Sequence, residues 1–341
     1  MTQPDTISAD YTLRPSELAS VLALLVEARQ PCIVWGPPGA AKSMIAQQVA
    51  ADASRRYVDV RALLLDPVDL RGIPWRDGAD RTRWAPPAFL PPSDDTGRWL
   101  INLEELPSAV PMVQAALYQL VLDRKVGEYE LPEGASLIAC GNRETDRGVV
   151  HRMPTPLASR FVHLDIRVDA RDWCNWGAAN GIAPEVLFFI EYEQDLLHQF
   201  DPQSKERAFP CPRTWEFASN IVRHRNGLDP EAERALFRGT VGEAAAVEFA
   251  AFLKVWRELP HPRAVVNDPE NADIPKNASA LMALCGALYK LASDVNFDAI
   301  VTYATRLRRE VGESLVGACV RREPALQRSP GFIRWAAAKT Q

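Results

Sequence analysis

Apolar runs of strand length alternate with longer stretches of helical spacing over the first half of the chain. The strand-like runs cover about residues 31–35, 57–60, 98–103, 136–140 and 162–166. Helical spacing follows Pro15, where apolar residues recur every three or four positions, and it returns at residues 44–53 and 108–125. This alternation predicts an α/β fold.

Two stretches interrupt the alternation. Residues 63–92 are rich in proline, which predicts an insertion in place of an ordinary crossover helix; a long surface loop is the simpler interpretation. Residues 126–134, which end in Pro132, Glu133 and Gly134, predict a hairpin that leads into the next strand.

After residue 168 the strand pattern fades and helical patterns take over. We therefore expect an α/β part over residues 1–168 and a helical part over 169–341. The helices are predicted at about residues 169–179, 184–198, 213–224, 230–238, 242–259, 279–292, 297–308 and 312–322, with loops at 201–212 and 261–277.

Composition places the chain among ordinary globular proteins, with 47% hydrophobic and 24% charged residues. The longest apolar runs are too short to span a bilayer and no signal peptide precedes them, so we expect a cytoplasmic protein without a membrane partner. The six scattered cysteines lack metal-ligand spacing and predict buried thiols. A net charge of −5 at pH 7 argues against a nucleic-acid partner, although a local basic pore would be compatible with it.

The stretch from Gly36 to Ser43 lies between a strand pattern and a helix pattern. Its spacing is that of the Walker A motif, G-x-x-x-x-G-K-[ST]. Backbone N–H groups of such a loop bind nucleotide phosphates, the lysine reaches the β and γ phosphates, and the serine hydroxyl binds Mg²⁺. The alternative is a Pro/Gly turn that happens to precede Lys42 and Ser43.

One position departs from the motif, because Ala41 stands where the second glycine is expected. An alanine adds only a methyl group there, provided that its backbone keeps φ below zero.

Two acidic residues, Glu104 and Glu105, end the apolar run that begins near Trp99. A phosphate-loop enzyme places one carboxylate near Mg²⁺ and the next near the attacking water in this way. Glu104 takes the place of the usual aspartate, and Glu105 would polarise the water. A solvated strand end is the alternative.

Three further polar residues are candidates for the same site. Asn142 follows a strand and could orient the attacking water, or it is a turn residue. Arg160 precedes a strand and could reach a neighbouring subunit's γ-phosphate, or it forms a surface ion pair. Arg213 lies in the first turn of a helix, where a cation opposes the helix dipole, so either a phosphate or a salt bridge would compensate it.

Taken in order, these motifs resemble those of the AAA+ ATPases, and within them the MoxR type. The Ala-Lys form of the Walker A loop occurs in that group, residues 63–92 look like its helix-2 insert, and residues 126–134 like its pre-sensor hairpin. The resemblance covers about residues 14–225. It implies an αβα sandwich with a parallel sheet, followed by an all-helical lid and C-terminal region.

The resemblance also assigns roles to single residues. Ser43 and Glu104 would bind Mg²⁺, Glu105 would be the second Walker B acid, Asn142 sensor 1, Arg160 the arginine finger and Arg213 sensor 2. The ATP-binding residues would be Gly36, Pro37, Pro38, Gly39, Ala40, Ala41, Lys42, Ser43 and Met44.

Members of this group form rings, usually hexameric, that remodel protein clients together with von Willebrand factor A domain partners. The resemblance therefore implies a Mg²⁺-dependent ATPase in a homo-oligomeric ring. An ATP-gated assembly scaffold with little hydrolysis is a second hypothesis, which the glutamate at position 104 could produce. A nucleic-acid translocase is a third, against which the acidic net charge speaks, and a small-molecule kinase is a fourth.

Overall fold

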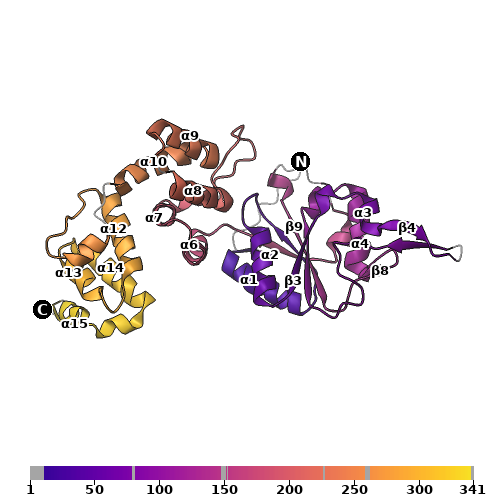
Figure 1. The fold of residues 1–341 in the computed structure, drawn as a ribbon, viewed down its shortest axis with the longest axis horizontal. Coiled ribbons are helices and arrows are strands. Elements are labelled where there is room, and N and C mark those ends of the chain that lie inside the picture. The colour runs from indigo at the N-terminus through magenta and orange to yellow at the C-terminus, as the bar shows by residue number, and fades with distance from the viewer. Residues whose placement is uncertain are drawn as a thin grey trace. The chain divides into compact units, whose positions relative to one another are not determined.

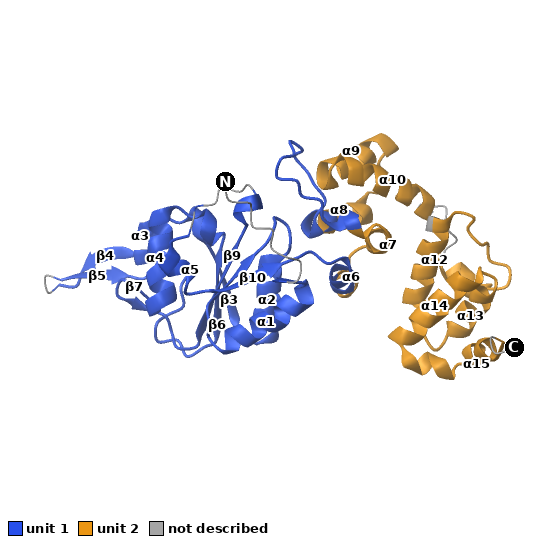
Figure 2. Ribbon diagram, turned by 180° about the vertical axis from the view of Figure 1, so that it is seen from behind, with its two compact units in different colours: residues 1–176, 195–215 blue, residues 177–194, 216–341 orange. Residues whose placement is uncertain are grey.

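The computed structural model describes residues 11–78, 81–146, 151, 153–225, 227–257 and 262–338 (Figure 1). The chain divides into two compact units (Figure 2). The first comprises residues 1–176 and 195–215, and the second comprises residues 177–194 and 216–341. The sequence placed one boundary after residue 168, whereas the first unit extends to Trp176 and includes a later segment.

The first unit is built on a six-stranded sheet in the order β1-β10-β2-β9-β6-β3, and all neighbouring strands in it are parallel. Its strands are β1 (Thr12–Leu13), β2 (Cys32–Trp35), β3 (Arg56–Arg61), β6 (Trp99–Glu104), β9 (Ala135–Gly141) and β10 (Val162–Ile166). Five of these strands match the predicted apolar runs. The two-residue strand β1 was missed, because it is too short to show a pattern.

Helices cover both faces of this sheet. On one face, α1 (Pro15–Glu27) and α2 (Lys42–Asp52) bury Leu22 and Ala46 against strand residues such as Val34. On the other face, α4 (Pro111–Asp123) buries a row of apolar side chains against Ile33 and Ile101. Alternate residues of the central strands β2, β9 and β6 thus enter opposite cores, which is why these strands are mostly apolar. The αβα sandwich expected from the sequence is confirmed.

The predicted insertion has secondary structure of its own. After β3, the chain forms a short helix α3 (Pro67–Arg71) and then β4 (Ile73–Arg76) and β5 (Thr82–Ala85), which pair as an antiparallel hairpin. The surface-loop interpretation of residues 63–92 is therefore wrong. The second predicted hairpin is confirmed as β7 (Lys125–Val126) paired with β8 (Tyr129–Glu130).

The rest of the chain is helical, as predicted. The remaining helices are α5 (Thr155–Ala158), α6 (Ala170–Ala179), α7 (Pro184–Tyr192), α8 (Pro212–His224), α9 (Pro230–Val241), α10 (Glu243–Arg257), α11 (Pro262–Asn267), α12 (Ala278–Leu291), α13 (Phe297–Thr305), α14 (Arg309–Arg322) and α15 (Pro330–Ala338). Helix α11 falls where the sequence predicted a loop, and α15 was not predicted.

Burial explains the helices of the second unit better than local sequence does. Helices α11 to α14 share an apolar core that includes Val265, Leu288, Phe297 and Val316. Val265 belongs to α11, so tertiary packing stabilises a helix of only one or two turns that would be marginal in isolation.

All six cysteines are buried free thiols, in agreement with the sequence. Of the helices that the structure describes, none combines the length and apolar character that a bilayer crossing requires.

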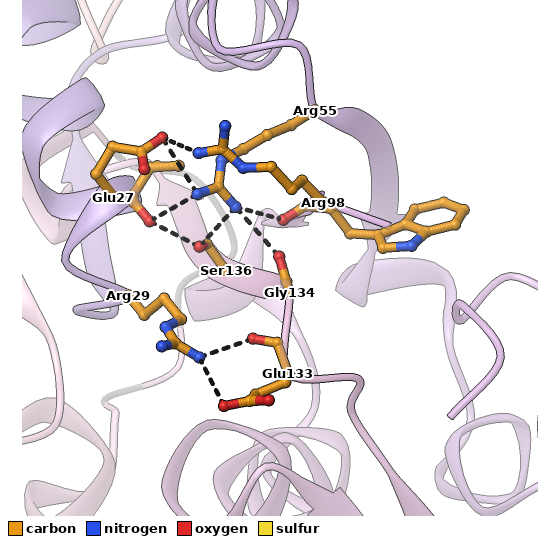
Figure 3. Close-up of polar contacts among 9 residues, drawn as sticks. Glu27, Arg29, Arg55, Arg98, Glu133, Gly134 and Ser136 are labelled. Carbon is orange, nitrogen blue, oxygen red and sulfur yellow. Dashed lines mark hydrogen bonds and ion pairs between the residues drawn. The ribbon is translucent and has the colours of Figure 1, made fainter. Parts of the chain in front are cut away.

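A buried arginine ties together the amino-terminal ends of the central strands (Figure 3). Arg55 donates to the carbonyl oxygens of Gly134 (3.2 Å) and Val26 (3.4 Å), and it pairs with Glu27 at 3.3 Å. Val26 and Glu27 end α1, where a cation is favoured by the helix dipole. Ser136 completes this group, because it accepts from Arg55 and donates to Val26. We call Arg55, Val26, Glu27, Gly134 and Ser136 the amino-edge cluster.

Candidate functional site

The predicted site residues follow strands that end at the same edge of the sheet. β2 ends at Trp35, β6 at Glu104 and β9 at Gly141, and these three strands are parallel and lie in the order β2-β9-β6. The Walker A loop, the acid pair and Asn142 therefore lie at the carboxyl edge. This is the edge at which open α/β sheets bind ligands.

Close packing explains the glycines of the Walker A loop. A side chain at Gly36 would clash with Ile166, since a Cβ atom there would lie 2.4 Å from its Cγ2. Gly39 has φ +77°, and a Cβ atom there would lie 2.5 Å from the Cys211 sulfur. Both positions thus require glycine, one for space and the other for backbone conformation as well.

Ala41 is in the left-handed conformation, with φ 65° and ψ 22°. The sequence analysis assumed that φ stays below zero there, and this assumption is wrong. A left-handed alanine costs about 1–2 kcal/mol because its Cβ crowds the backbone. The second glycine of the motif would avoid this cost, so the departure at position 41 stores strain next to Lys42.

Lys42 is half-buried and its ammonium group contacts only neutral oxygen atoms. Nζ donates to the carbonyls of Gly36 (2.7 Å) and Pro37 (3.1 Å) and to Oδ1 of Asn142 (2.9 Å). Burial lowers the pKa of this ammonium group. Within the described residues no carboxylate pairs with it, so the cation lacks a counter-ion.

The start of α2 offers further hydrogen-bond donors. Lys42, Ser43 and Met44 are its first three residues, and the first backbone N–H bonded within the helix is that of Ile45, to Ala41. The preceding N–H groups have no intrahelical acceptor, and the helix dipole favours an anion in front of them. Ser43 is half-buried and Met44 is exposed. Pro37, Pro38 and Ala40 complete the predicted loop.

Asn142 lies at the tip of β9, where the structure brings it to Lys42. Among the described residues, the lysine is the side-chain hydrogen-bond partner of Asn142. The next residue, Arg143, pairs with Asp165 of β10 at 2.8 Å and thereby links the tips of two strands. Arg143 was not among the predicted site residues.

The two acidic residues differ in their surroundings. Glu104 ends β6, and its Oε1 accepts a hydrogen bond of 2.7 Å from the Asn102 amide. Glu105 is exposed and takes the left-handed conformation, with φ 54° and ψ 32°. A non-glycine residue there is strained, and such strain concentrates at functional sites.

Arg160 follows α5 and is exposed. Within the part of the chain that the structure describes, its guanidinium group forms no ion pair, so the surface ion pair considered above is not observed. A hydrogen-bonded link joins its loop to β2. Trp35 donates from Nε1 to Nδ1 of His163 at 2.9 Å, and Nε2 of the same ring lies 2.9 Å from the Ala158 carbonyl. Since Nδ1 accepts, Nε2 carries the proton and donates.

Arg213 lies two residues after Cys211, whose side chain packs against Gly39. The second residue of α8 is thus held next to the Walker A loop, and it is exposed. No salt bridge of Arg213 occurs among the described residues, so the alternative of a salt bridge is not observed. An anion at the loop would compensate this cation at the positive end of the helix.

His198 also contacts the loop and was missed by the sequence analysis. Its Nε2 lies 3.2 Å from the Pro38 carbonyl, and its ring lies near Phe200 and Phe209. Burial lowers the pKa of this imidazole. No local pattern marks a lone histidine 160 residues away as a loop contact. Only the tertiary structure reveals it.

Together these residues fit a nucleotide and its magnesium ion. The ammonium group of Lys42, the amino terminus of α2 and the exposed guanidinium group of Arg213 suit a polyphosphate. Ser43 and Glu104 offer the oxygen ligands that Mg²⁺ prefers, and phosphate and water oxygens would complete its shell. Among the described residues there is no cluster of His, Cys, Asp and Glu side chains that could hold a metal ion by itself.

No protein-family model and no curated protein matches the chain. Solved structures with a similar outline include NtrX from Brucella abortus in complex with ADP, at 12% identity and a TM-score of 0.41, covering 95% of this chain and 67% of that one. The RuvB Holliday junction branch migration motor from Thermotoga maritima is 14% identical, with a TM-score of 0.40 and 80% coverage of each chain. We therefore derive function from the residues of this chain.

Proposed function

We propose that the protein binds ATP with Mg²⁺ at the carboxyl edge of the sheet and hydrolyses it. The observation that carries this proposal is the ammonium group of Lys42, which is half-buried, donates to three neutral acceptors and has no anionic partner in the part of the chain that the structure describes. A buried cation without a counter-ion is costly, and a phosphate group would compensate it.

Each predicted site residue would have a role in ATP binding or hydrolysis. The loop from Gly36 to Ser43 and the start of α2 would hold the phosphates, with Lys42 at the β and γ phosphates. Ser43 and Glu104 would hold Mg²⁺, which neutralises phosphate charge when bound. Glu105 would take a proton from the attacking water. Asn142, which is anchored to Lys42, would orient that water.

Two arginines would act on the γ-phosphate from outside this set. Arg213 would reach it from the start of α8, which packs against Gly39 through Cys211. Arg160 has no ion-pair partner among the described residues, and it would act on the nucleotide of a neighbouring subunit. A guanidinium group delivered in this way contributes about 10³–10⁵ in rate.

A site that needs Arg160 from a neighbour implies a homo-oligomeric ring, and we propose a hexamer of the MoxR type in the cytoplasm. Hydrolysis in the ring would remodel a protein client, with a von Willebrand factor A domain protein as partner. The hairpin β4–β5 lies within residues 63–92, the segment that the resemblance likens to a helix-2 insert, and it supports this part of the proposal.

A second candidate is an ATP-gated assembly scaffold, and the strained turn at Glu105 together with the glutamate at 104 favours it. If Glu104 slows hydrolysis, Glu104→Asp should raise turnover strongly. A nucleic-acid translocase is the third candidate, and stimulation of turnover by DNA or RNA would support it.

The experiment that tests the main proposal follows ATP turnover against protein concentration, with mass measured by light scattering. Arg160→Ala is mixed into wild type, and Arg321→Ala, an exposed arginine of α14, is the matched control. We expect turnover to rise with assembly and to fall as Arg160→Ala is added, but not with Arg321→Ala. Turnover that is independent of concentration and of the Arg160 variant would rule out the shared site.

A further inference from the structure

Strand β6 contains one amide among buried apolar residues. Leu100, Ile101 and Leu103 are fully buried, and so is Asn102 between them. Its Oδ1 is buried and has no hydrogen-bond partner within the described residues. A leucine would suit this strand interior better, since an unpartnered buried carbonyl is destabilising. Stability therefore does not explain why residue 102 is an asparagine.

The hydrogen bonds of the Asn102 amide nitrogen offer an explanation. Nδ2 donates to Oε1 of Glu104 at 2.7 Å and to the hydroxyl oxygen of Tyr57 at 2.8 Å, which uses both of its hydrogens. The orientation of the amide is fixed by chemistry, because an ionised carboxylate only accepts and would repel Oδ1. Among the described residues, Asn102 thus leaves its oxygen without a hydrogen bond, while its nitrogen holds Glu104.

Strand geometry makes this contact possible. Side chains two residues apart in a strand lie on the same face, so Asn102 and Glu104 both face the side of the sheet that α1 and α2 cover. That side also carries Lys42 at the start of α2. Among the described residues, the second carboxylate oxygen of Glu104 makes no hydrogen bond, which leaves it available.

We propose that Asn102 is a positioning residue that binds one oxygen of Glu104 and thereby presents the other to the Mg²⁺ ion of the nucleotide. This inference rests on the proposed function. It also gives the extra methylene of Glu104 a role, because the longer side chain lets the carboxylate bend back to Asn102.

The test compares Asn102→Leu with Tyr57→Phe as the matched control. The control removes the other partner of the same amide and leaves the bond to Glu104 in place. ADP binding is measured by isothermal titration calorimetry at increasing Mg²⁺ concentration, and ATP turnover is measured in parallel. Since ligands that orient a metal-binding group typically contribute about 10–100-fold to metal affinity, Asn102→Leu should raise the Mg²⁺ requirement by that factor. Tyr57→Phe should leave it nearly unchanged.

Glu104→Asp keeps the test decisive if Asn102→Leu does not fold. We expect this variant also to need more Mg²⁺, because it loses the bond to Asn102. An unchanged Mg²⁺ requirement in Asn102→Leu, or tighter Mg²⁺ binding in Glu104→Asp, would overturn the positioning role. Absence of ADP binding by the wild type at any Mg²⁺ concentration would instead overturn the proposed function itself.

Discussion

Each edge of the parallel sheet carries a cation that is at least half-buried. The two cations differ in the groups to which they donate hydrogen bonds. At the amino edge, Arg55 has carbonyl, hydroxyl and carboxylate partners, including Glu27. At the carboxyl edge, Lys42 has three neutral partners and, within the ranges that the structure describes, no carboxylate. We propose that the compensated cation, Arg55, serves stability and that the cation without a charged partner, Lys42, serves a ligand.

Backbone strain at the two ends of α2 shows the same contrast. Ala41 precedes α2 and Ser54 follows it, and both are left-handed, with φ 65° and 52°. The left-handed residue Ser54 lies beside the amino-edge cluster and only changes the direction of the chain. The left-handed residue Ala41, by contrast, shapes a loop that would bind phosphate. Four predictions test how far this comparison holds.

The largest expected effect concerns the amino edge. Arg55→Leu should lower the free energy of unfolding by about 3–5 kcal/mol, because it leaves buried carbonyls and Glu27 without their donor. Denaturant unfolding measures this change. Arg56→Leu is the matched control: its pair with Asp95 involves a side chain that is 64% exposed, so the loss should stay below about 1 kcal/mol. Equal losses in both variants would show that burial of Arg55 does not matter.

At the carboxyl edge, the expected loss is one of activity. Lys42→Met should lower ATP turnover by about 10²–10³-fold, as expected when one donor to developing phosphate charge is removed. Its thermal midpoint without nucleotide should not fall, because the variant also removes a desolvated cation. A marked loss of stability would mean that Lys42 is a structural residue like Arg55.

A smaller effect should follow from relief of backbone strain. Ala41→Gly should stabilise the protein by about 1 kcal/mol, since the relief of left-handed strain outweighs the greater chain entropy of the unfolded state. Ser54→Gly should give a similar gain and serves as the control. Calorimetric ADP binding should change only for Ala41→Gly, and a change for Ser54→Gly as well would break the distinction between the two edges.

The smallest effect is a dependence on pH. His198 has an ordinary pKa of 6.5, and burial lowers it in the folded protein, so the unfolded chain binds the proton more readily. Stability should therefore be full above about pH 6.5 and fall as the pH drops through the lowered value. His198→Leu should flatten this decline in thermal midpoints between about pH 7 and about pH 5. A decline of the same size in the variant would assign it to other groups.

Much of the first unit could be predicted from the sequence. Apolar runs located β2, β3, β6, β9 and β10, because the strand residues that enter the two cores must be apolar. Motif spacing placed Lys42, Glu104 and Asn142 after strand ends, and parallel pairing then brought them to one edge. The hairpin after Val126 was visible because its turn residues are local signals.

The sequence did not contain local signals for the contacts that complete the site. His198 meets Pro38, and Cys211 meets Gly39, across separations of more than 150 residues along the chain. The pairing of β4 with β5 was hidden by prolines, which usually indicate loops. The left-handed conformations of Ala41 and Glu105 were unexpected, because non-glycine residues adopt them only where the surrounding structure imposes them.

By itself, then, the sequence determined the α/β plan, the phosphate-loop motif and the residues at the strand ends, because hydrophobic periodicity and short motifs are local properties. Only the tertiary structure decided which polar groups satisfy one another. It gave Arg55 partners from α1, β6 and β9, and among the residues it describes it left Lys42 with neutral oxygens alone. The physical reason is that compensation of a buried charge depends on distances between residues far apart in the chain, which no local pattern encodes.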